Sequence, residues 1–190
     1  IFVSVVPAAT QILCWGSGVQ VQAPPALSTA IAISVGSSHM LALKKDGTVI
    51  GWSLDGSGAI PVPSGLSNVV AISAGYSYSL ALKSDGTVVS WANGVDLQAA
   101  PADLSDVVGI AAGNYRALAL KSDGTVVSWG NSDYDGIGTI PAGLSDVVSI
   151  SMRFGFALAL KGDGTVVEWG SSGLGSPPPL SLSGVTAISA

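Results

Sequence analysis

The ten residues LKSDGTVVSW occur twice in this chain without a change, at residues 82–91 and at residues 120–129. Two close variants stand at residues 43–52 (LKKDGTVIGW) and 160–169 (LKGDGTVVEW). Each copy places an Asp-Gly pair between two apolar runs. Such a pair favours a β-hairpin with a type I′ turn, whose two central positions need a positive φ that Asp tolerates and Gly adopts freely. The sequence therefore predicts one hairpin, repeated four times.

The spacing of these copies indicates a repeat architecture. The Asp-Gly pairs follow one another at 39, 38 and 40 residues, and the tryptophans and a Pro-x-x-Leu-Ser motif keep a similar period. In each unit a β-branched run, such as residues 68–74, and a short loop precede the hairpin. Consecutive apolar residues in the LAL segment predict a sheet buried on both faces. Small antiparallel sheets repeated at this length are typical of an all-β propeller, whereas a parallel β-helix has shorter rungs.

The chain holds material for about five short blades of three to four antiparallel strands. Residues 10–16 match the last strand of a unit, and residues 185–190 match a first strand. We therefore expect a single domain over residues 1–190, with the ring closed by a split blade formed from residues 1–16 and 185–190. The alternatives are a segment of a larger, seven-bladed propeller and, for residues 1–8, the remnant of a secretory signal.

The unit VVAISAGYSYSLALKSDGTVVSW (residues 69–91) resembles the repeats of the regulator of chromosome condensation family. The short period and the trailing IPAGLSDVV (residues 140–148) look most like the bacterial propeller that inhibits β-lactamases. The resemblance covers nearly the whole chain and implies a propeller, although the family's propellers usually have seven blades. Because the family serves nucleotide exchange, light sensing and enzyme inhibition, the resemblance implies no single function.

One loop varies between the copies while the hairpin does not. This variable loop reads GSSHM at residues 36–40, GYSYS at 75–79, GNYRA at 113–117 and RFGFA at 153–157. Equivalent loops of a propeller emerge on one face, so we predict a rim of large side chains there. Tyr and Arg often anchor protein interfaces, which makes this rim a candidate site for a protein partner. The rim residues are His39, Tyr76, Tyr78, Tyr115, Arg116, Arg153, Phe154 and Phe156.

The resemblance implies the same surface, because aromatic residues on such loops form the gripping surface of the β-lactamase-inhibiting relative. We therefore expect a non-catalytic scaffold for protein–protein interaction, with enzyme inhibition as one form of it. A carbohydrate-binding propeller is the alternative, but a repeated sugar site should repeat its polar residues. The residues at one matched loop position differ: Ser37, Tyr76, Asn114 and Phe154.

Charge and composition argue against several other functions. The net charge is −5 and the seven basic residues are scattered, which leaves no basic stripe for nucleic acid. No apolar run approaches the roughly 18 residues of a membrane helix. With His39 as the one histidine and no zinc-type His/Cys spacing, we expect neither an enzyme nor a metal or cofactor site. We expect a monomer, because a closed ring leaves no strand edge unpaired, and a secreted or cell-surface bacterial location.

Residues 131–136 (NSDYDG) resemble the start of a calcium loop, with oxygen-bearing side chains at positions 1, 3 and 5 before a glycine. Position 12, where the closing Glu would stand, is Ala142, and the other copies lack these acids. We therefore interpret the segment as an Asx-rich turn.

Overall fold

In the computed structural model, the strands follow one another along the chain in groups of three. The structure describes residues 2–6, 11–15, 27–54, 60–92, 99–130, 136–153, 155–170 and 182–190. All regular elements in this part of the chain are β-strands, which confirms the all-β prediction. The described residues include no helix long and apolar enough to cross a membrane.

Four three-stranded antiparallel sheets form the blades, which we name A to D. Blade A consists of β3 (Ala30–Val35), β4 (His39–Lys44) and β5 (Val49–Ser53). Blade B consists of β6 (Val69–Ala74), β7 (Tyr78–Lys83) and β8 (Val88–Ala92). Blade C consists of β9 (Val107–Ala112), β10 (Arg116–Lys121) and β11 (Val126–Gly130). Blade D consists of β12 (Val147–Arg153), β13 (Phe156–Lys161) and β14 (Val166–Gly170).

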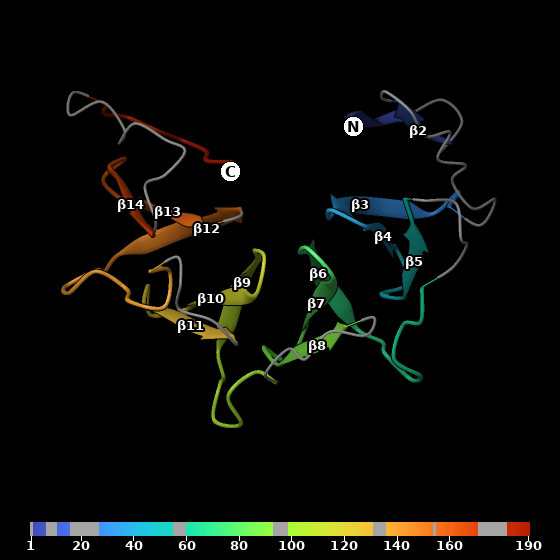
Figure 1. Cartoon of the computed structure of the whole chain (residues 1–190), viewed down its shortest axis with the longest axis horizontal. Coiled ribbons are helices and arrows are strands. Elements are labelled where there is room, and N and C mark those ends of the chain that lie inside the picture. Colours follow the sequence, from blue (N-terminus) through green and yellow to red (C-terminus); the bar gives the residue numbers. More distant parts are fainter. Residues whose placement is uncertain are drawn as a thin grey trace.

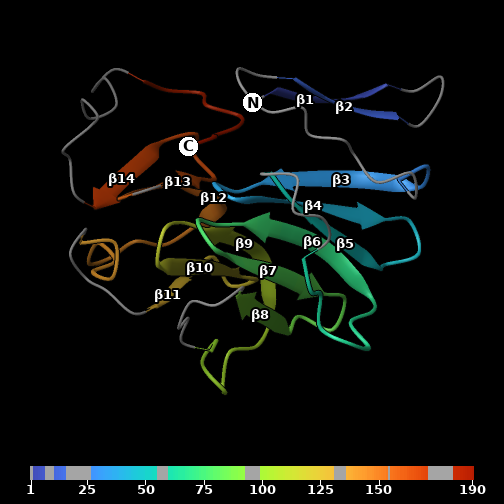
Figure 2. The ribbon, with the colours of Figure 1, turned by 45° about the vertical axis from the view of Figure 1, so that its right-hand side comes forward.

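A two-stranded hairpin precedes blade A, formed by β1 (Phe2–Val6) and β2 (Gln11–Trp15). The blades follow one another in an arc, with their first strands β3, β6, β9 and β12 toward the centre (Figure 1). Consecutive first strands contact each other. Figure 2 shows the same succession in an oblique view, with the hairpin β1–β2 above β3. This is the arrangement of propeller blades around a common axis.

The Asp-Gly hairpins form as predicted, but their turns are of another type. In blade B, Gly86 donates its N–H to the Lys83 carbonyl at 3.0 Å, and only Gly86, with φ of 78°, has a positive φ. The loop is therefore a type I turn followed by a left-handed glycine rather than a type I′ turn. The Asp85 carboxylate supports it by accepting bonds from the Thr87 N–H (3.0 Å) and hydroxyl (2.6 Å).

Large and small side chains of the middle strands interlock between blades. Leu80 and Leu82 of blade B share a core cluster with Ala117 and Ala119 of blade C. The next joint repeats the pattern with Leu118, Leu120, Ala157 and Ala159. In the Leu-Ala-Leu segment the leucine side chains therefore pack against the following blade, and the alanine side chain packs against the preceding blade. This confirms the prediction that both faces of the sheets are buried.

A second type of joint links the inner strands. The N–H of Ala74 donates to Ser34 Oγ of the preceding blade at 2.9 Å, and the N–H of Ala112 donates to Ser73 Oγ at 3.0 Å. Residues 185–190 dock on blade D in the same way, because the N–H of Ala190 donates to Ser151 Oγ at 2.8 Å. The C-terminal segment therefore occupies the place of a first strand. Its pairing with β1, the number of blades and the closure of the ring stay predictions.

Candidate binding face around the axial cavity

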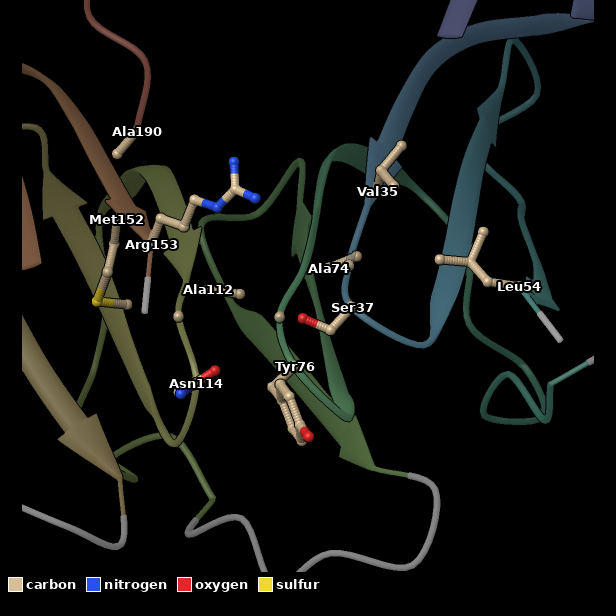
Figure 3. A pocket seen from close by; sticks show the side chains of 13 residues that line it. Val35, Ser37, Leu54, Ala74, Tyr76, Ala112, Asn114, Met152, Arg153 and Ala190 are labelled. Carbon is tan, nitrogen blue, oxygen red and sulfur yellow. The ribbon is translucent and has the colours of Figure 1, made fainter. Parts of the chain in front are cut away.

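The variable loops gather at one end of the axis, where they surround a cavity of about 320 Å³ (Figure 3). Matched positions of the blades contribute to its wall: Val35, Ala74 and Ala112 at the ends of their inner strands, Met152 next to the end of β12, and Ala190 in the C-terminal segment. The loop residues Ser37, Tyr76 and Asn114 complete the wall together with Arg153. The face predicted from the copies thus has a hollow at its centre, lined by four blades and the C-terminal segment.

Close contacts between neighbouring loops explain why the variable loops of blades A and B begin with glycine. A Cβ atom on Gly36 would lie 2.2 Å from the carbonyl oxygen of Gly75, and one on Gly75 would lie 2.5 Å from that of Gly113. These carbonyls accept backbone bonds from the preceding loops, including one from the Tyr76 N–H to Gly113 at 3.0 Å. The fourth loop departs from this pattern, because Arg153 stands at the glycine position.

Two of the predicted rim residues form an exposed aromatic pair. Tyr76 is 42% exposed and Tyr115 is 44% exposed, and their ring centroids lie 6.1 Å apart with the planes tilted by 44°. Both flanking loops hold the backbone of Tyr76, since its carbonyl also accepts a bond from Ser38 Oγ at 3.0 Å. The pair therefore stands on a fixed backbone beside the cavity.

His39 and Tyr78 differ from the prediction, because both are buried. His39 Nε2 lies 2.9 Å from Ser79 Oγ of the next blade, and burial lowers the pKa of the imidazole. The Tyr78 hydroxyl donates to the Arg116 carbonyl and accepts a bond from the Gly113 N–H at 2.9 Å, while burial raises the pKa of the phenol. Both residues begin a middle strand, where the side chain points into the joint with the next blade. They connect blades and are not available to a partner.

The other rim residues are placed as follows. Phe156 and Arg116 occupy the same strand position as His39 and are half-buried. Arg153 is exposed and extends beside the cavity (Figure 3). Phe154 lies outside the described residues. Of the predicted rim, Tyr76, Tyr115 and Arg153 are the described members that are well exposed.

Sequence reasoning missed Ser37 and Asn114, which also line the cavity. A signal for them exists in the sequence, since both stand at a loop position that differs in all four copies. No group of three or more potential metal ligands occurs among the described residues, while residues 131–135 of the Asx-rich segment lie outside them.

The opposite end of the blades carries paired charges. At each Asp-Gly turn a lysine lies within 4 Å of the turn aspartate, as in the 2.8 Å contact between Lys83 Nζ and Asp85 Oδ2. The other pairs are Lys44–Asp46, Lys121–Asp123 and Lys161–Asp163. Hydrogen bonds from the hydroxyl and the N–H of the turn threonine lower the pKa of the carboxyl groups of Asp46, Asp123 and Asp163. For Asp85 the hydrogen bond from Lys83 is the largest cause of the lowered pKa, followed by those from Thr87. These exposed pairs contribute little to stability.

Comparisons with known proteins agree with this architecture. Residues 30–59, 69–91 and 107–135 match the regulator of chromosome condensation (RCC1) repeat. No curated protein matches the chain at a significant level.

Solved structures of similar fold come from plants, animals and yeast. The ectodomain of the Physcomitrella patens receptor kinase CR4 superposes with a TM-score of 0.71 and 23% identity, over 88% of this chain and 49% of that one. Human WBSCR16 gives a TM-score of 0.64 and 21% identity, over 87% and 54%. Yeast RCC1 (Prp20), solved in a complex with Kap60, superposes with a TM-score of 0.58 and 20% identity. The match covers 75% of this chain and 44% of that one. The chain thus spans about half the length of these proteins, and the likeness concerns the fold.

Proposed function

We propose that this chain, a β-propeller in which three segments match the RCC1 repeat, is a non-catalytic scaffold that binds a protein partner through its variable-loop face. One protein of similar fold, yeast RCC1 (Prp20), has been crystallised with Kap60 bound to it. The observation that carries the proposal for this chain is the exposed Tyr76–Tyr115 pair.

Physical arguments favour this pair as an anchor. An aromatic side chain offers a large apolar area together with a polar hydroxyl, and it has few rotatable bonds to immobilise on binding. Tyr76 and Tyr115 come from adjacent blades whose backbones are already joined by the bond from Tyr76 N–H to the Gly113 carbonyl. A surface that is ordered before binding loses less conformational entropy in the complex.

Replacing both tyrosines tests the proposal. We expect Tyr76→Ala with Tyr115→Ala to weaken partner binding by at least about 2 kcal/mol, or roughly 30-fold, because two interface anchors are lost together. The matched control is Val70→Thr with Val108→Thr, which changes exposed residues of the same two blades at their opposite ends. Partner candidates are identified by cross-linking to the intact chain, and their affinities are then measured by calorimetry for all three proteins.

The proposal would be contradicted if a partner bound the double tyrosine variant as tightly as the unchanged chain. It would also be contradicted if the double valine variant lost binding while the double tyrosine variant kept it. Enzyme inhibition is the narrower form of the proposal. It is tested by adding the purified chain to a panel of β-lactamases, where the double tyrosine variant should relieve any inhibition that the unchanged chain produces.

A further inference from the structure

The joint between blades C and D lacks a hydrogen bond that the other joints have near the variable-loop face. Ser34 and Ser73 each accept a bond from an N–H of the next inner strand, at 2.9 and 3.0 Å. Ala111 stands at the matched position of blade C, and its methyl group cannot accept a bond. The serine returns in blade D, where Ser151 Oγ accepts a bond from the C-terminal segment at 2.8 Å.

The bond between neighbouring variable loops is also missing from this joint. Across the joint between A and B, the Ser37 N–H donates to the Gly75 carbonyl at 3.2 Å. Across the joint between B and C, the Tyr76 N–H donates to the Gly113 carbonyl at 3.0 Å. The Asn114 N–H, at the matched position of blade C, makes no such bond with another described residue.

The packing between blades C and D at this end is also more easily displaced. A Cβ atom on Gly75 would lie 2.5 Å from the Gly113 carbonyl oxygen, whereas one on Gly113 would meet the side chain of Met152 at 3.1 Å. A thioether side chain has three rotatable bonds and adapts more readily than a backbone carbonyl. Arg116 and Arg153 also lie at this end and have interaction partners of their own. The difference between the joints therefore lies in the serine bond, the loop bond and the side chain that fills the gap.

The other end of the same joint, at the Asp-Gly turns, is built like its counterparts. The Val147 N–H donates to the Gly124 carbonyl at 3.2 Å, just as the Val69 N–H donates to the Gly47 carbonyl at 3.1 Å. Leucines and alanines of blades C and D also share one core cluster. A joint that is fixed at one end and has fewer bonds at the other can open as a hinge.

We propose that the joint between blades C and D opens at the variable-loop face and is the gate of the axial cavity. Blade D supplies Met152 and Arg153 to the cavity wall, and Figure 3 shows both across the opening from Ser37 and Ala74. Opening moves this part of the wall away from Asn114, while the bonds between blades A, B and C hold the other loops in place. A group too large for the closed cavity of about 320 Å³ then has a way in.

Cysteine labelling measures the opening, because matched alanines are fully buried in two joints. Ala157 packs near the loop end of the joint between C and D, and Ala117 has the same place between B and C. Each is changed to Cys in a Cys14→Ser background, which removes the single native thiol. One hydrogen bond changes an opening equilibrium about fivefold, so iodoacetamide should label Ala157→Cys roughly 30-fold faster than Ala117→Cys. Rates measured in urea correct for the intrinsic reactivity of each thiol.

Two reciprocal changes assign the opening to the missing serine. Ala111→Ser supplies an acceptor for the Met152 N–H and should slow the labelling of the Ala157→Cys variant about fivefold. Ser73→Ala removes the matched bond between blades B and C and should speed the labelling of the Ala117→Cys variant by a similar factor.

Met152 reports on the gate without an introduced cysteine. Its side chain lines the cavity and the residue is only 6% exposed, so opening of the joint should speed its oxidation by hydrogen peroxide. Peptide mass mapping should show sulfoxide formation about fivefold slower in Ala111→Ser than in the unchanged chain. This measurement decides the question if thermal melts show that a cysteine variant does not fold.

The gate is supported if Ala157→Cys is labelled faster than Ala117→Cys and Ala111→Ser slows that labelling. It is overturned if the two positions react at equal rates, or if Ala111→Ser changes neither labelling nor oxidation. Ala159→Cys, nearer the turn end, tests the hinge: labelling as fast as at Ala157→Cys would mean that blade D separates as a whole, and would overturn the hinge. Because every variant keeps both tyrosines of the exposed pair, failure here is distinguishable from failure of the protein-partner proposal.

Discussion

Single glycines at the loop face fix how closely neighbouring blades approach. A methyl group on Gly75 would lie 2.5 Å from the Gly113 oxygen and 2.7 Å from the Tyr78 ring, so the joint would have to open. Gly109 offers a matched contrast, because a methyl group there meets nothing nearer than 3.4 Å and the equivalent residues of blades A and B are Ala32 and Ala71. The same substitution should therefore have opposite effects at the two sites.

We predict that Gly75→Ala lowers the free energy of unfolding by about 1–3 kcal/mol, the usual range for forced overpacking. Gly109→Ala should leave it unchanged or raise it by about 0.5 kcal/mol, because alanine restricts the unfolded chain. Urea denaturation of both variants measures the difference. Equal stabilities would show that the joint between blades B and C is looser than these contacts indicate.

The buried imidazole of His39 predicts a dependence of stability on pH. Burial lowers the pKa of His39 below its ordinary value of 6.5, so the unfolded chain takes up a proton more readily than the folded one. The stability contribution of the neutral imidazole is complete above about pH 6.5 and is lost as the pH falls through the folded-state pKa. The four turn aspartates do not interfere, since their pKa values are lowered from 3.8.

The melting temperature should therefore fall between pH 7 and pH 5, and His39→Gln should remove most of that fall because an amide can bond Ser79 without titrating. Thermal melts followed by circular dichroism across this range compare the two slopes. An equally steep fall in the Gln variant would assign the effect to another group.

At the scale of the elements, each inner strand carries a bulge at its second residue. In β6 the pairing with β7 skips Val70, between Val69 and Ala71, and Val70 is 54% exposed. The same position is exposed in the other blades: Ile31, Val108 and Val148. A bulge re-aims one side chain out of the ladder, so an apolar β-branched residue reaches solvent in every blade.

The elements also show what sequence can and cannot predict here. The hairpins and the two buried faces of the Leu-Ala-Leu strand could be predicted, because turn chemistry and side-chain period are local properties. The exposure of Val70 could not, since a β-branched residue in an apolar run has the pattern of a core residue. The burial of His39 and Tyr78 depends on which way the first residue of a middle strand faces, and that direction is set by the neighbouring blade. The cavity, likewise, exists only once several loops are placed around one axis.

At the scale of the whole molecule, blade D has one face packed on blade C and a second face, pointing away from blade C, where a following blade would pack. Leu158 is only partly buried, whereas the equivalent leucines of the other blades, Leu41, Leu80 and Leu118, are fully buried against the next blade. Residues 185–190 bond to blade D at the positions where an inner strand of a following blade would lie. In Figure 1 the C-terminal segment and the hairpin β1–β2 flank the open side of the arc. We propose that this hairpin supplies the other two strands and closes a five-bladed ring.

The repeat gives the expected register of that closure. Phe2 lies opposite Trp15 as Ser79 lies opposite Trp91, so Ser4 corresponds to Ala81. Because Ile72 pairs with Ala81 and Ile188 corresponds to Ile72, Ile188 should face Ser4. Directly opposed strand residues have Cβ atoms about 4.5–5.5 Å apart, close enough for a disulfide with a small shift of the strands.

We predict that Ser4→Cys with Ile188→Cys forms an intramolecular disulfide under mild oxidation. The variant is made in a Cys14→Ser background, where serine matches the residue before the tryptophan in blades B and C. Non-reducing electrophoresis and peptide mass mapping detect the bond, and Lys45→Cys with Ile188→Cys serves as the pair that should not join. Disulfides between two chains, in place of the internal one, would contradict this closure. They would mean that the C-terminal segment pairs with a hairpin from another chain. The arc would then be part of a longer array, and the axial cavity would have a wider ring of blades around it.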